Sequence, residues 1–359
     1  MTRAVVLLLV LGLVAFGAAA VGVVAGVGTG PCGERRIEAA SSTTGFDATF
    51  VGDTMLGDAA APLLAAQGYD WAFAGLAGVL DDGFVMANAE GPITTLTEPF
   101  DTAQHWHYNA QPGSAAAIAR VGIDAVSLAN NHAMDRGPAG LADTTSTLTA
   151  SGVAAVGAGP TMCEAELPLL VRTPAGTLGV VALGKYYGRE KTASLAGAGT
   201  VAFSEASIIR GATLARSAGA DWVVAFVHWG GNYGDVDAEQ EDLAEAFAEA
   251  GYDLVVGAHP HVSQRIDVID RMPVVYSMGN FVFGAPGRFA PERPGAGLVV
   301  KASFDQDGLA ALTVRCVDTN NDTVAYQPRP CDAPMAATTF ASLNPAMVVN
   351  GGVGTLAIP

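Results

Sequence analysis

Basic residues are scarce in this sequence. Its 359 residues include 18 lysines and arginines against 35 aspartates and glutamates, and only three of the 18 are lysines, so the formal net charge is −17. A surface this acidic repels phosphate backbones and anionic lipids, which argues against nucleic acid as a partner. An anionic substrate would need something other than basic side chains to attract it, and a bound metal ion is the first candidate.

Charged residues of either sign are also few. They make up 15% of the chain, whereas hydrophobic residues make up 50%, and soluble domains usually carry about 25% charged residues. A chain of this length and apolar content can bury a large core. Disorder is therefore excluded as the main property of the chain, and one large domain or two medium ones are expected.

Cysteine is sparse too, and no pair has the Cys-x-x-Cys spacing, which argues against a zinc site built from thiolates. Four cysteines, an even number, suit an oxidising compartment. Cys316 and Cys331 lie in a segment rich in turn residues, and we predict that they form a bridge, which would stabilise the fold by about 3 kcal/mol. Cys32 and Cys163 remain, either paired with each other or free.

A long apolar run follows Arg3 at the amino terminus. Residues 4–27 carry no charge, and as a helix they would reach about 36 Å, enough to cross a hydrocarbon core of about 30 Å. We expect residues 1–28 to be a single-pass membrane anchor. The alternative is a signal peptide cleaved near Ala18 and Ala20, which would give a secreted protein. Either alternative places the body of the protein outside the cell membrane.

The rest of the chain reads as a linker, a body and an extension. Residues 29–45 are polar and are expected to be a linker. From residue 46 to about 335, apolar runs of strand length alternate with amphipathic stretches, which is typical of an α/β domain. Residues 336–359 show little pattern and are expected to form a loosely held extension. The expected strands are 47–52, 83–89, 125–129, 178–183, 222–227, 254–257, 274–278, 296–304 and 310–317, and the expected helices are 112–121, 140–151, 204–218 and 239–250.

Polar residues gather where the expected strands end. They are Asp53, Asn88, Glu90, Asn130, Asn131, His132, His228, His259, His261 and Asn280. Because ligands bind at the carboxyl ends of strands in open α/β sheets, we expect these residues to form one site. His259 and His261 flank one residue, so in extended backbone their side chains would point to the same side and converge on one cation. Imidazole, carboxylate and amide groups without thiolate suit zinc, manganese or iron rather than calcium.

The strings around these residues resemble the CapA/PgsA capsule-synthesis family, a branch of the calcineurin-like metallophosphoesterase superfamily. The resemblance covers residues 46 to about 305, and the matching strings follow the family's order. These strings are GDTMLG at 52–57, NAEGP at 88–92, SLANNHAMDRG at 127–137, HWGGNY at 228–233, GAHPHV at 257–262 and YSMGNFVFG at 276–284.

The resemblance implies a four-layer α/β/β/α sandwich of the metallophosphoesterase type, with one or two divalent metal ions (manganese, zinc or iron) at one edge. The implied metal ligands are Asp53, Glu90, Asn131, His228, His259 and His261. His132 resembles the histidine that protonates the leaving group. The sequence departs from the superfamily at Met55, where a histidine ligand is usual, and at Asn232, where relatives often carry a carboxylate. One firmly held ion and one weakly held ion are therefore expected.

Other residues near the motifs are candidates for substrate contacts. The predicted substrate-binding residues are Asn130, Arg136, Lys185 and Arg265. The three basic ones could neutralise an anion, and the alternative is that they are ordinary solvated charges. His105 and His107 alternate as on a strand, and we expect them to line the substrate cleft or to pack in a sheet rather than to bind metal. Asn280 is expected to order loops through backbone hydrogen bonds.

These observations favour an exported, membrane-anchored, metal-dependent hydrolase of the phosphoesterase type that acts in capsule or cell-envelope polymer synthesis. Its substrate would be a phosphoester or, by family association, poly-γ-glutamate, in which case the reaction is amide cleavage or transfer. The alternative is a non-catalytic subunit of a capsule-synthesis complex that binds or exports polymer and retains the metal fold. Other capsule-synthesis subunits are possible partners. His132 beside the ligand set favours hydrolysis, because a binding module has no need of a proton donor there.

Overall fold

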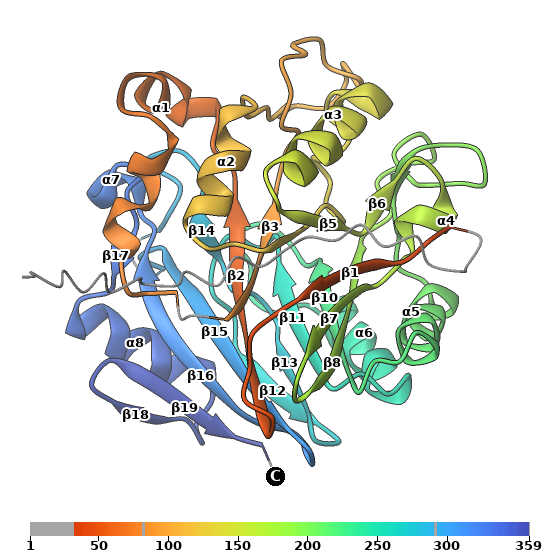
Figure 1. Ribbon diagram of the computed structural model, residues 1–359. Helices are drawn as coiled ribbons and strands as arrows, with labels where there is room; N and C mark the ends of the chain where they lie inside the picture. Colours follow the sequence, from red (N-terminus) through yellow and green to blue (C-terminus); the bar gives the residue numbers. More distant parts are fainter. Residues whose placement is uncertain (1–31, 81–82, 291–292, 359) are drawn as a thin grey trace, which may run out of the picture.

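The computed structural model describes residues 32–80, 83–290 and 293–358. The expected anchor or signal segment over residues 1–28 lies outside this part of the chain. Within the described residues, no helix is both long and apolar enough to cross a membrane. Two β-sheets make up the centre of the molecule, and helices lie outside them (Figure 1).

The first sheet has seven strands in the order β1-β7-β8-β10-β11-β13-β12. Its middle strands β8, β10, β11 and β13 run parallel to one another. Strands of this kind are buried on both faces, which explains their near-continuous runs of valine, alanine and leucine. The bounds are β1 Arg35–Glu38, β7 Leu169–Thr173, β8 Gly176–Gly184, β10 Trp222–His228, β11 Leu254–Ala258, β12 Ile266–Ile269 and β13 Met272–Val275.

The second sheet has ten strands in the order β18-β19-β16-β15-β2-β3-β4-β5, with β14 paired to β2 and β17 paired to β16. Strands β2, β3, β4 and β5 are parallel. Strands β15, β16, β19 and β18 pair antiparallel in that order, and β15 is also antiparallel to β2. The bounds are β2 Gly45–Thr54, β3 Phe84–Ala89, β4 Ala125–Ser127, β5 Ala154–Val156, β14 Asn280–Val282, β15 Ala296–Asp305, β16 Gly308–Asp318, β17 Arg329–Pro330, β18 Val348–Asn350 and β19 Val353–Ala357; a separate pair is β6 Ala158–Gly159 with β9 Gly199–Thr200.

The core forms three apolar layers. One lies between the sheets and includes Phe50, Phe84 and Phe226. The second lies between the ten-stranded sheet and the helices α1 to α3, and the third lies between the seven-stranded sheet and the helices α5 and α6. The layers thus run helix, sheet, sheet, helix, and the predicted α/β class is confirmed. The helices are η1 Asp58–Ala60, α1 Ala61–Gln67, η2 Tyr69–Leu76, α2 Gly113–Arg120, α3 Gly137–Ala150, α4 Met162–Ala165, α5 Glu205–Ser217, α6 Ala238–Glu249, α7 Asn321–Val324 and α8 Ala333–Leu343.

The structure differs from the expected boundaries at both ends of the body. The expected linker contains β1, which pairs in parallel with β7. The expected boundary at residue 335 falls inside α8, whose Phe340 is buried in the layer between the sheets. Strand β19 then pairs with β16. The described part of the expected extension therefore belongs to the sheet and its core.

Both disulfides are present. Cys316 and Cys331 are bridged across a separation of 15 residues, as predicted. Cys32 and Cys163 are also bridged, across a separation of 131 residues, which decides between the two alternatives left open by the sequence. The second bridge ties the segment before β1 to the short helix α4.

Candidate metal centre

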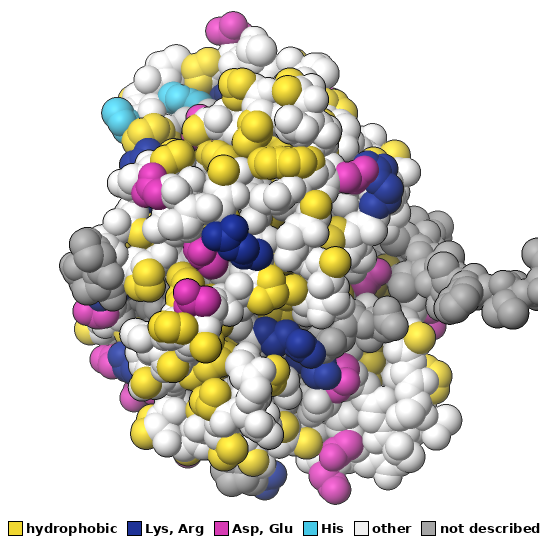
Figure 2. Space-filling view, turned by 90° about the vertical axis from the view of Figure 1, so that its left-hand side faces the viewer, with side chains coloured by type: hydrophobic (Ala, Val, Ile, Leu, Met, Phe, Trp, Pro, Cys, Tyr) yellow, Lys and Arg dark blue, Asp and Glu magenta, His cyan; other side chains and the backbone are white. Residues whose placement is uncertain are grey.

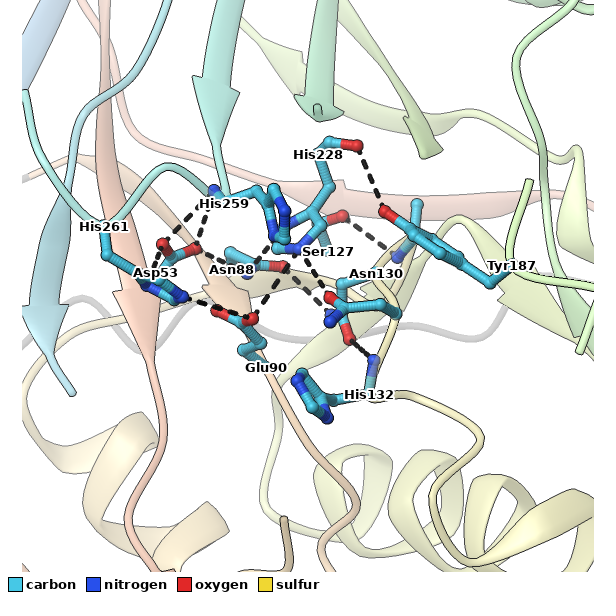
Figure 3. A network of polar contacts seen from close by, with 12 residues as sticks. Asp53, Asn88, Glu90, Ser127, Asn130, His132, Tyr187, His228, His259 and His261 are labelled. Carbon is cyan, nitrogen blue, oxygen red and sulfur yellow. Dashed lines mark hydrogen bonds and ion pairs between the residues drawn. The ribbon is translucent and has the colours of Figure 1, made fainter. Parts of the chain in front are cut away.

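The carboxyl ends of strands from both sheets meet at one place (Figure 3). In the ten-stranded sheet, Asp53 on β2 stands opposite Asn88 on β3 and Asn280 on β14. In the seven-stranded sheet, His228 ends β10 opposite the last residue of β11, and His259 follows β11 directly. The parallel pairing in each sheet therefore delivers carboxylates from one side and imidazoles from the other.

Five of the expected ligands converge, and they form two groups that share Glu90. One group contains Glu90, His259 and His261, and the other contains Asp53, Glu90 and His228. Within each group the potential ligand atoms lie within 4.8 Å of one another. Figure 3 shows these side chains pointing into a common space. A carboxylate shared by two groups is the arrangement expected of a site that can hold two neighbouring ions.

Glu90 is the side chain that most needs a cation. It is 1% exposed, and neither of its carboxylate oxygens has a hydrogen-bond partner. Nδ1 of His259 is likewise buried without a partner. Oε1 of Glu90 lies 3.7 Å from Nε2 of His228 and 4.0 Å from Nε2 of His261, and these contacts are ion pairs only when the imidazoles are protonated. Buried carboxylates without hydrogen bonds are costly, and buried charges are normally paired or coordinate a metal. The residues present therefore fit a divalent cation.

The pKa shifts within the cluster also favour metal binding. Burial, together with the nearby charge of Asp53, raises the pKa of Glu90 well above its usual value. Burial opposes ionisation of Asp53 as well, but hydrogen bonds from His261 and Asn88 lower its pKa overall. Burial lowers the pKa of His259 to about 3 and lowers that of His228 well below the usual range. Both imidazoles are thus neutral near pH 7, the form that binds metal ions.

The backbone around His259 and His261 is not extended, which corrects the expectation from their spacing. Their φ angles are 97° and 59°, both in the left-handed region. The two rings nevertheless lie near each other, with centroids 5.9 Å apart. Non-glycine residues pay about 1–3 kcal/mol for such conformations, which persist where the surroundings over-determine them and cluster at functional sites. A strained turn after β11, rather than a strand, brings the two histidines together.

Two buried asparagines support the expected ligands through hydrogen bonds. Asn88 donates to Oδ1 of Asp53 at 2.8 Å and lies 3.3 Å from Nδ1 of His228. Asn130 donates to Oδ1 of Asn88 at 3.0 Å and to the carbonyl of Ala89 at 2.9 Å. Asn130 is 1% exposed. The structure therefore places Asn130 in the support of the ligands, not at the substrate contact that we expected.

Two further amides contact imidazole ligands directly. Oδ1 of Asn131 lies 2.8 Å from Nε2 of His228, and Asn131 also lines the cavity beside the ligands. Oδ1 of Asn280 lies 3.0 Å from Nδ1 of His261. Asn280 therefore orients a ring through its side chain, whereas the sequence suggested only backbone bonds. Partners of this kind fix which imidazole nitrogen faces a metal.

His132 forms a pair with Asp135. Its Nδ1 lies 2.7 Å from Oδ2 of Asp135, and Gln104 donates to the other oxygen of that carboxylate at 2.8 Å. The ring of Tyr108 packs against His132 with centroids 4.0 Å apart. The sequence singled out His132 but missed Asp135 and Gln104. Asp135 lies three residues after His132 within the SLANNHAMDRG string, and that spacing was an available signal.

The three basic residues expected to bind substrate do not line the cavity beside the ligands. Lys185 is paired at 2.9 Å with a glutamate of α6. Arg265 is paired with Glu241 and Asp267 and lines a different cavity of about 410 Å³. Arg136 donates to the carbonyl of the residue before it. Their positions next to motifs in the sequence did not place them at the cavity. Carboxylates hold Lys185 and Arg265 elsewhere, and Nε of Arg136 is buried without a hydrogen-bond partner.

The cavity beside the ligands has a volume of about 160 Å³. His105 lines it, as expected, although residues 104–108 form a loop and not a strand. His107 is not part of the lining, and its Nε2 lies 2.7 Å from the carbonyl of Asp101. The lining residues are Met55, Asp58, Gln104, His105, Trp106, Tyr108, Asn131, His132, Asn232, Tyr233, His259, His261, Phe283, Gly284, Ala285 and Arg288.

Comparison with known proteins identifies the family. Residues 47–285 match the family model described as "Bacterial capsule synthesis protein PGA_cap". The chain belongs to this family. The resemblance to capsule-synthesis proteins noted in the sequence is thereby confirmed.

Curated relatives of this PGA_cap protein include two from Bacillus. "PGA biosynthesis protein CapA" of Bacillus subtilis (strain 168) is 30% identical over 241 residues, which cover 66% of this chain and 63% of the relative. "Capsule biosynthesis protein CapA" of Bacillus anthracis is 31% identical over 252 residues, covering 66% and 59%. The chain thus spans less than two thirds of the length of either relative.

Solved structures resemble the PGA_cap protein only distantly. One is titled "2.05 Angstrom Crystal Structure of Putative 5'-Nucleotidase from Staphylococcus aureus in complex with alpha-ketoglutarate". It aligns with a TM-score of 0.43 and 13% sequence identity, and the alignment covers 83% of this chain and 58% of that one.

Proposed function

We propose that this PGA_cap protein is an exported, metal-dependent hydrolase of the phosphoesterase type that cleaves a bond in an anionic capsule polymer, poly-γ-glutamate. The observation that carries the proposal is Glu90. Its buried carboxylate has no hydrogen-bond partner and lies among His228, His259 and His261. The His132–Asp135 pair is next to this cluster, and His132 lines the same cavity. A site that only bound polymer would need neither feature.

The metal would be held by the two groups that share Glu90. We assign Asp53, Glu90 and His228 to one ion, and Glu90, His259 and His261 to the other, with Asn131 as a further oxygen donor. A divalent ion there supplies Lewis acidity, which polarises a carbonyl or phosphoryl oxygen and makes water more acidic. Manganese, zinc and iron all suit imidazole with carboxylate. The layering of helix, sheet, sheet and helix supports a fold of the metallophosphoesterase type.

The role of His132 follows from its partners. Asp135 accepts a hydrogen bond from Nδ1 of His132, which favours the tautomer with its proton on Nδ1. Nε2 is then left to exchange a proton with a ligand. The ring is 5% exposed and is held between Tyr108 and Asp135. We assign to His132 the transfer of a proton to the leaving group, which for a γ-glutamyl bond is the amine nitrogen. General acid catalysis of this kind contributes about 10²- to 10⁴-fold.

Two observations support export. Both cysteine pairs are disulfides, and such bonds persist in oxidising compartments outside the cytosol. The apolar run at residues 4–27 is long enough for a membrane anchor, and a cleaved signal peptide is the alternative. An exported domain would meet the capsule polymer and other capsule-synthesis subunits at the membrane surface.

The test pairs metal content with turnover in the full chain. We expect His259→Ala to lose metal and activity together, because it removes a ligand that no neighbour replaces. His132→Ala should keep its metal but lose about 10²- to 10⁴-fold in turnover of γ-glutamyl peptides. His107→Ala is the matched control, since that histidine lies outside the cavity lining. A phosphoester panel assayed in parallel tests the other substrate class.

A non-catalytic subunit predicts a different result. Polymer production in cells would survive His132→Ala, and His259→Ala would act only by lowering protein stability. Full function of the His132→Ala strain at matched protein levels would therefore reject the hydrolase.

A further inference from the structure

Arg288 lies at the cavity in a position that the metal centre does not explain. It belongs to the loop between β14 and β15, is exposed, and lines the cavity together with Trp106. The centre of its guanidinium lies 4.7 Å from the centroid of the Trp106 ring. Trp106 is itself 43% exposed, so its ring holds the arginine by a cation–π contact. An exposed tryptophan at a cavity mouth is a ready contact surface for a ligand.

Arg288 also has no carboxylate partner among the described residues. Among the described residues that line the cavity it is the one Lys or Arg, and it forms no ion pair within the described part of the chain. Other basic side chains nearby are neutralised. Lys191 is paired with Asp101 at 2.9 Å, and Arg293 is paired with Asp235. On the face shown in Figure 2, Lys and Arg side chains are scattered and form no basic patch.

The size of the cavity limits what enters it. Its volume of about 160 Å³ is well below the roughly 300–1,000 Å³ of sites that enclose a drug-sized ligand. It can therefore take one small group next to the metal ligands, and the rest of a long ligand must lie outside, against Trp106 and His105. Asp58 also lines the cavity, and its carboxylate repels anions from that wall. Arg288 is the group that can offset this repulsion.

We propose that Arg288, held over Trp106, binds the carboxylate beside the scissile bond, so that the cavity takes the terminal residue of an anionic γ-glutamyl chain. This rests on the function proposed above. A γ-linked chain carries one free α-carboxylate on every residue, and a guanidinium pairs with a carboxylate through two parallel hydrogen bonds. A phosphate would satisfy the same guanidinium, and the experiment separates the two.

The experiment measures binding as well as turnover, on the full metal-loaded chain. Calorimetric titration with a defined γ-glutamyl oligomer is compared with the same oligomer whose α-carboxylates are amidated, and with inorganic phosphate. We expect Arg288→Gln to weaken oligomer binding by about tenfold to a hundredfold, the range for a charge-assisted hydrogen bond, with Arg288→Lys in between. Amidation should abolish the difference between wild type and Arg288→Gln. Arg210→Gln, on the outer face of α5, is the matched control.

The outcomes separate this inference from the hydrolase proposal. Arg288-dependent binding without cleavage would keep the inference and reject the hydrolase. Cleavage with the same KM and affinity in Arg288→Gln would keep the hydrolase and overturn the inference. Equal affinity for the amidated and free oligomers, a preference for phosphate, or no binding of the oligomer by the wild type would also overturn it. Metal content and melting temperature of each variant check that the site and fold are intact.

Discussion

Oδ2 of Asp135 lies 2.7 Å from Nδ1 of His132 and also accepts the backbone N–H of Tyr108 at 2.7 Å. The other oxygen of the same carboxylate accepts from Gln104. Asp135 is 2% exposed, so every partner of this carboxylate is supplied by the protein. It fixes both the orientation and the tautomer of His132, and it joins the loop before α2 to the turn before α3.

The first prediction concerns this pair. Asp135→Asn keeps the shape of the side chain but weakens the acceptor at Nδ1, which favours the wrong imidazole tautomer. We expect turnover to fall by about 10²- to 10⁴-fold while metal content stays unchanged, because Asp135 is not in either ligand group. Elemental analysis and steady-state kinetics on the same sample check this. Asp143→Asn, on α3, is the control; equal losses in both variants would mean a general structural effect.

The second prediction concerns Glu90 and metal removal. Glu90→Gln removes the carboxylate shared by both ligand groups, so we expect metal content to fall towards zero. The same change replaces an unsatisfied buried carboxylate with a neutral group. The metal-free variant should therefore unfold at a higher temperature than the metal-free wild type. The expected difference in the free energy of unfolding is about 1–3 kcal/mol. Thermal melts with and without chelator measure both effects. A chelator-treated wild type that is more stable than the variant would contradict the metal assignment.

The third prediction concerns pH and Asp124, which precedes β4. Burial raises the pKa of Asp124 to about 6, although its hydrogen bond from the N–H of Val85 opposes this. A raised pKa in the fold favours the protonated form, so this stabilisation is complete below the unfolded pKa near 4 and is lost as the pH rises through 6. The free energy of unfolding of Asp124→Asn, relative to that of the wild type, should therefore increase by about 1–3 kcal/mol from pH 4 to pH 7.5. Denaturant unfolding at both pH values measures it; a gain independent of pH would exclude this cause.

The fourth prediction concerns the bridges. Replacing Cys316 and Cys331 with serine should destabilise the protein by about 3 kcal/mol in the loop-entropy model. If the domain is exported, thiol labelling of intact cells should find no free cysteine until a reductant is added. The Cys32 and Cys163 pair provides the comparison. Labelling of either pair without reductant would argue against an oxidising compartment.

The sequence predicted the central strands and the convergence at their ends because both follow from local patterns. Buried parallel strands produce long apolar runs, and polar residues directly after such runs, such as Asp53 and His228, must lie at the carboxyl edge. Because the strands pair in parallel, their carboxyl ends lie at the same edge of each sheet, so the polar residues there are neighbours. Five residues that converge in the structure could thus be named before any geometry was known.

Other features depend on contacts between distant residues and left no local signal. Strand β1 has four residues, and its partner β7 lies more than 130 residues later. Arg288 reaches the cavity from a loop, whereas Arg265 lies near a motif in sequence but faces a different cavity. The convergence of His259 and His261 was predicted for the wrong reason, because a left-handed turn is not visible in their spacing.

Lys191 illustrates such a distant contact and gives the last prediction. It lies in the segment between β8 and β9, is 6% exposed, and its Nζ donates to Oε1 of Gln104 at 2.6 Å and to Asp101 at 2.9 Å. Gln104 in turn donates to Asp135, which holds His132. A buried lysine on the segment after β8 thus holds the amide of Gln104, which supports the His132–Asp135 pair.

We expect Lys191→Met to misplace Gln104 and so to lower kcat by about tenfold. KM and metal content should stay unchanged, because Lys191 contacts neither the proposed metal ligands nor any residue of the cavity lining except Gln104. Gln104→Ala should have a similar effect, and the double variant should be no worse than either single one, since both act through the same carboxylate. The matched control is Lys301→Met, which alters a lysine on β15 away from the site. Additive losses in the double variant would mean that Lys191 does not act through Gln104. A melting curve for each variant would then show whether the loss of activity follows a loss of stability.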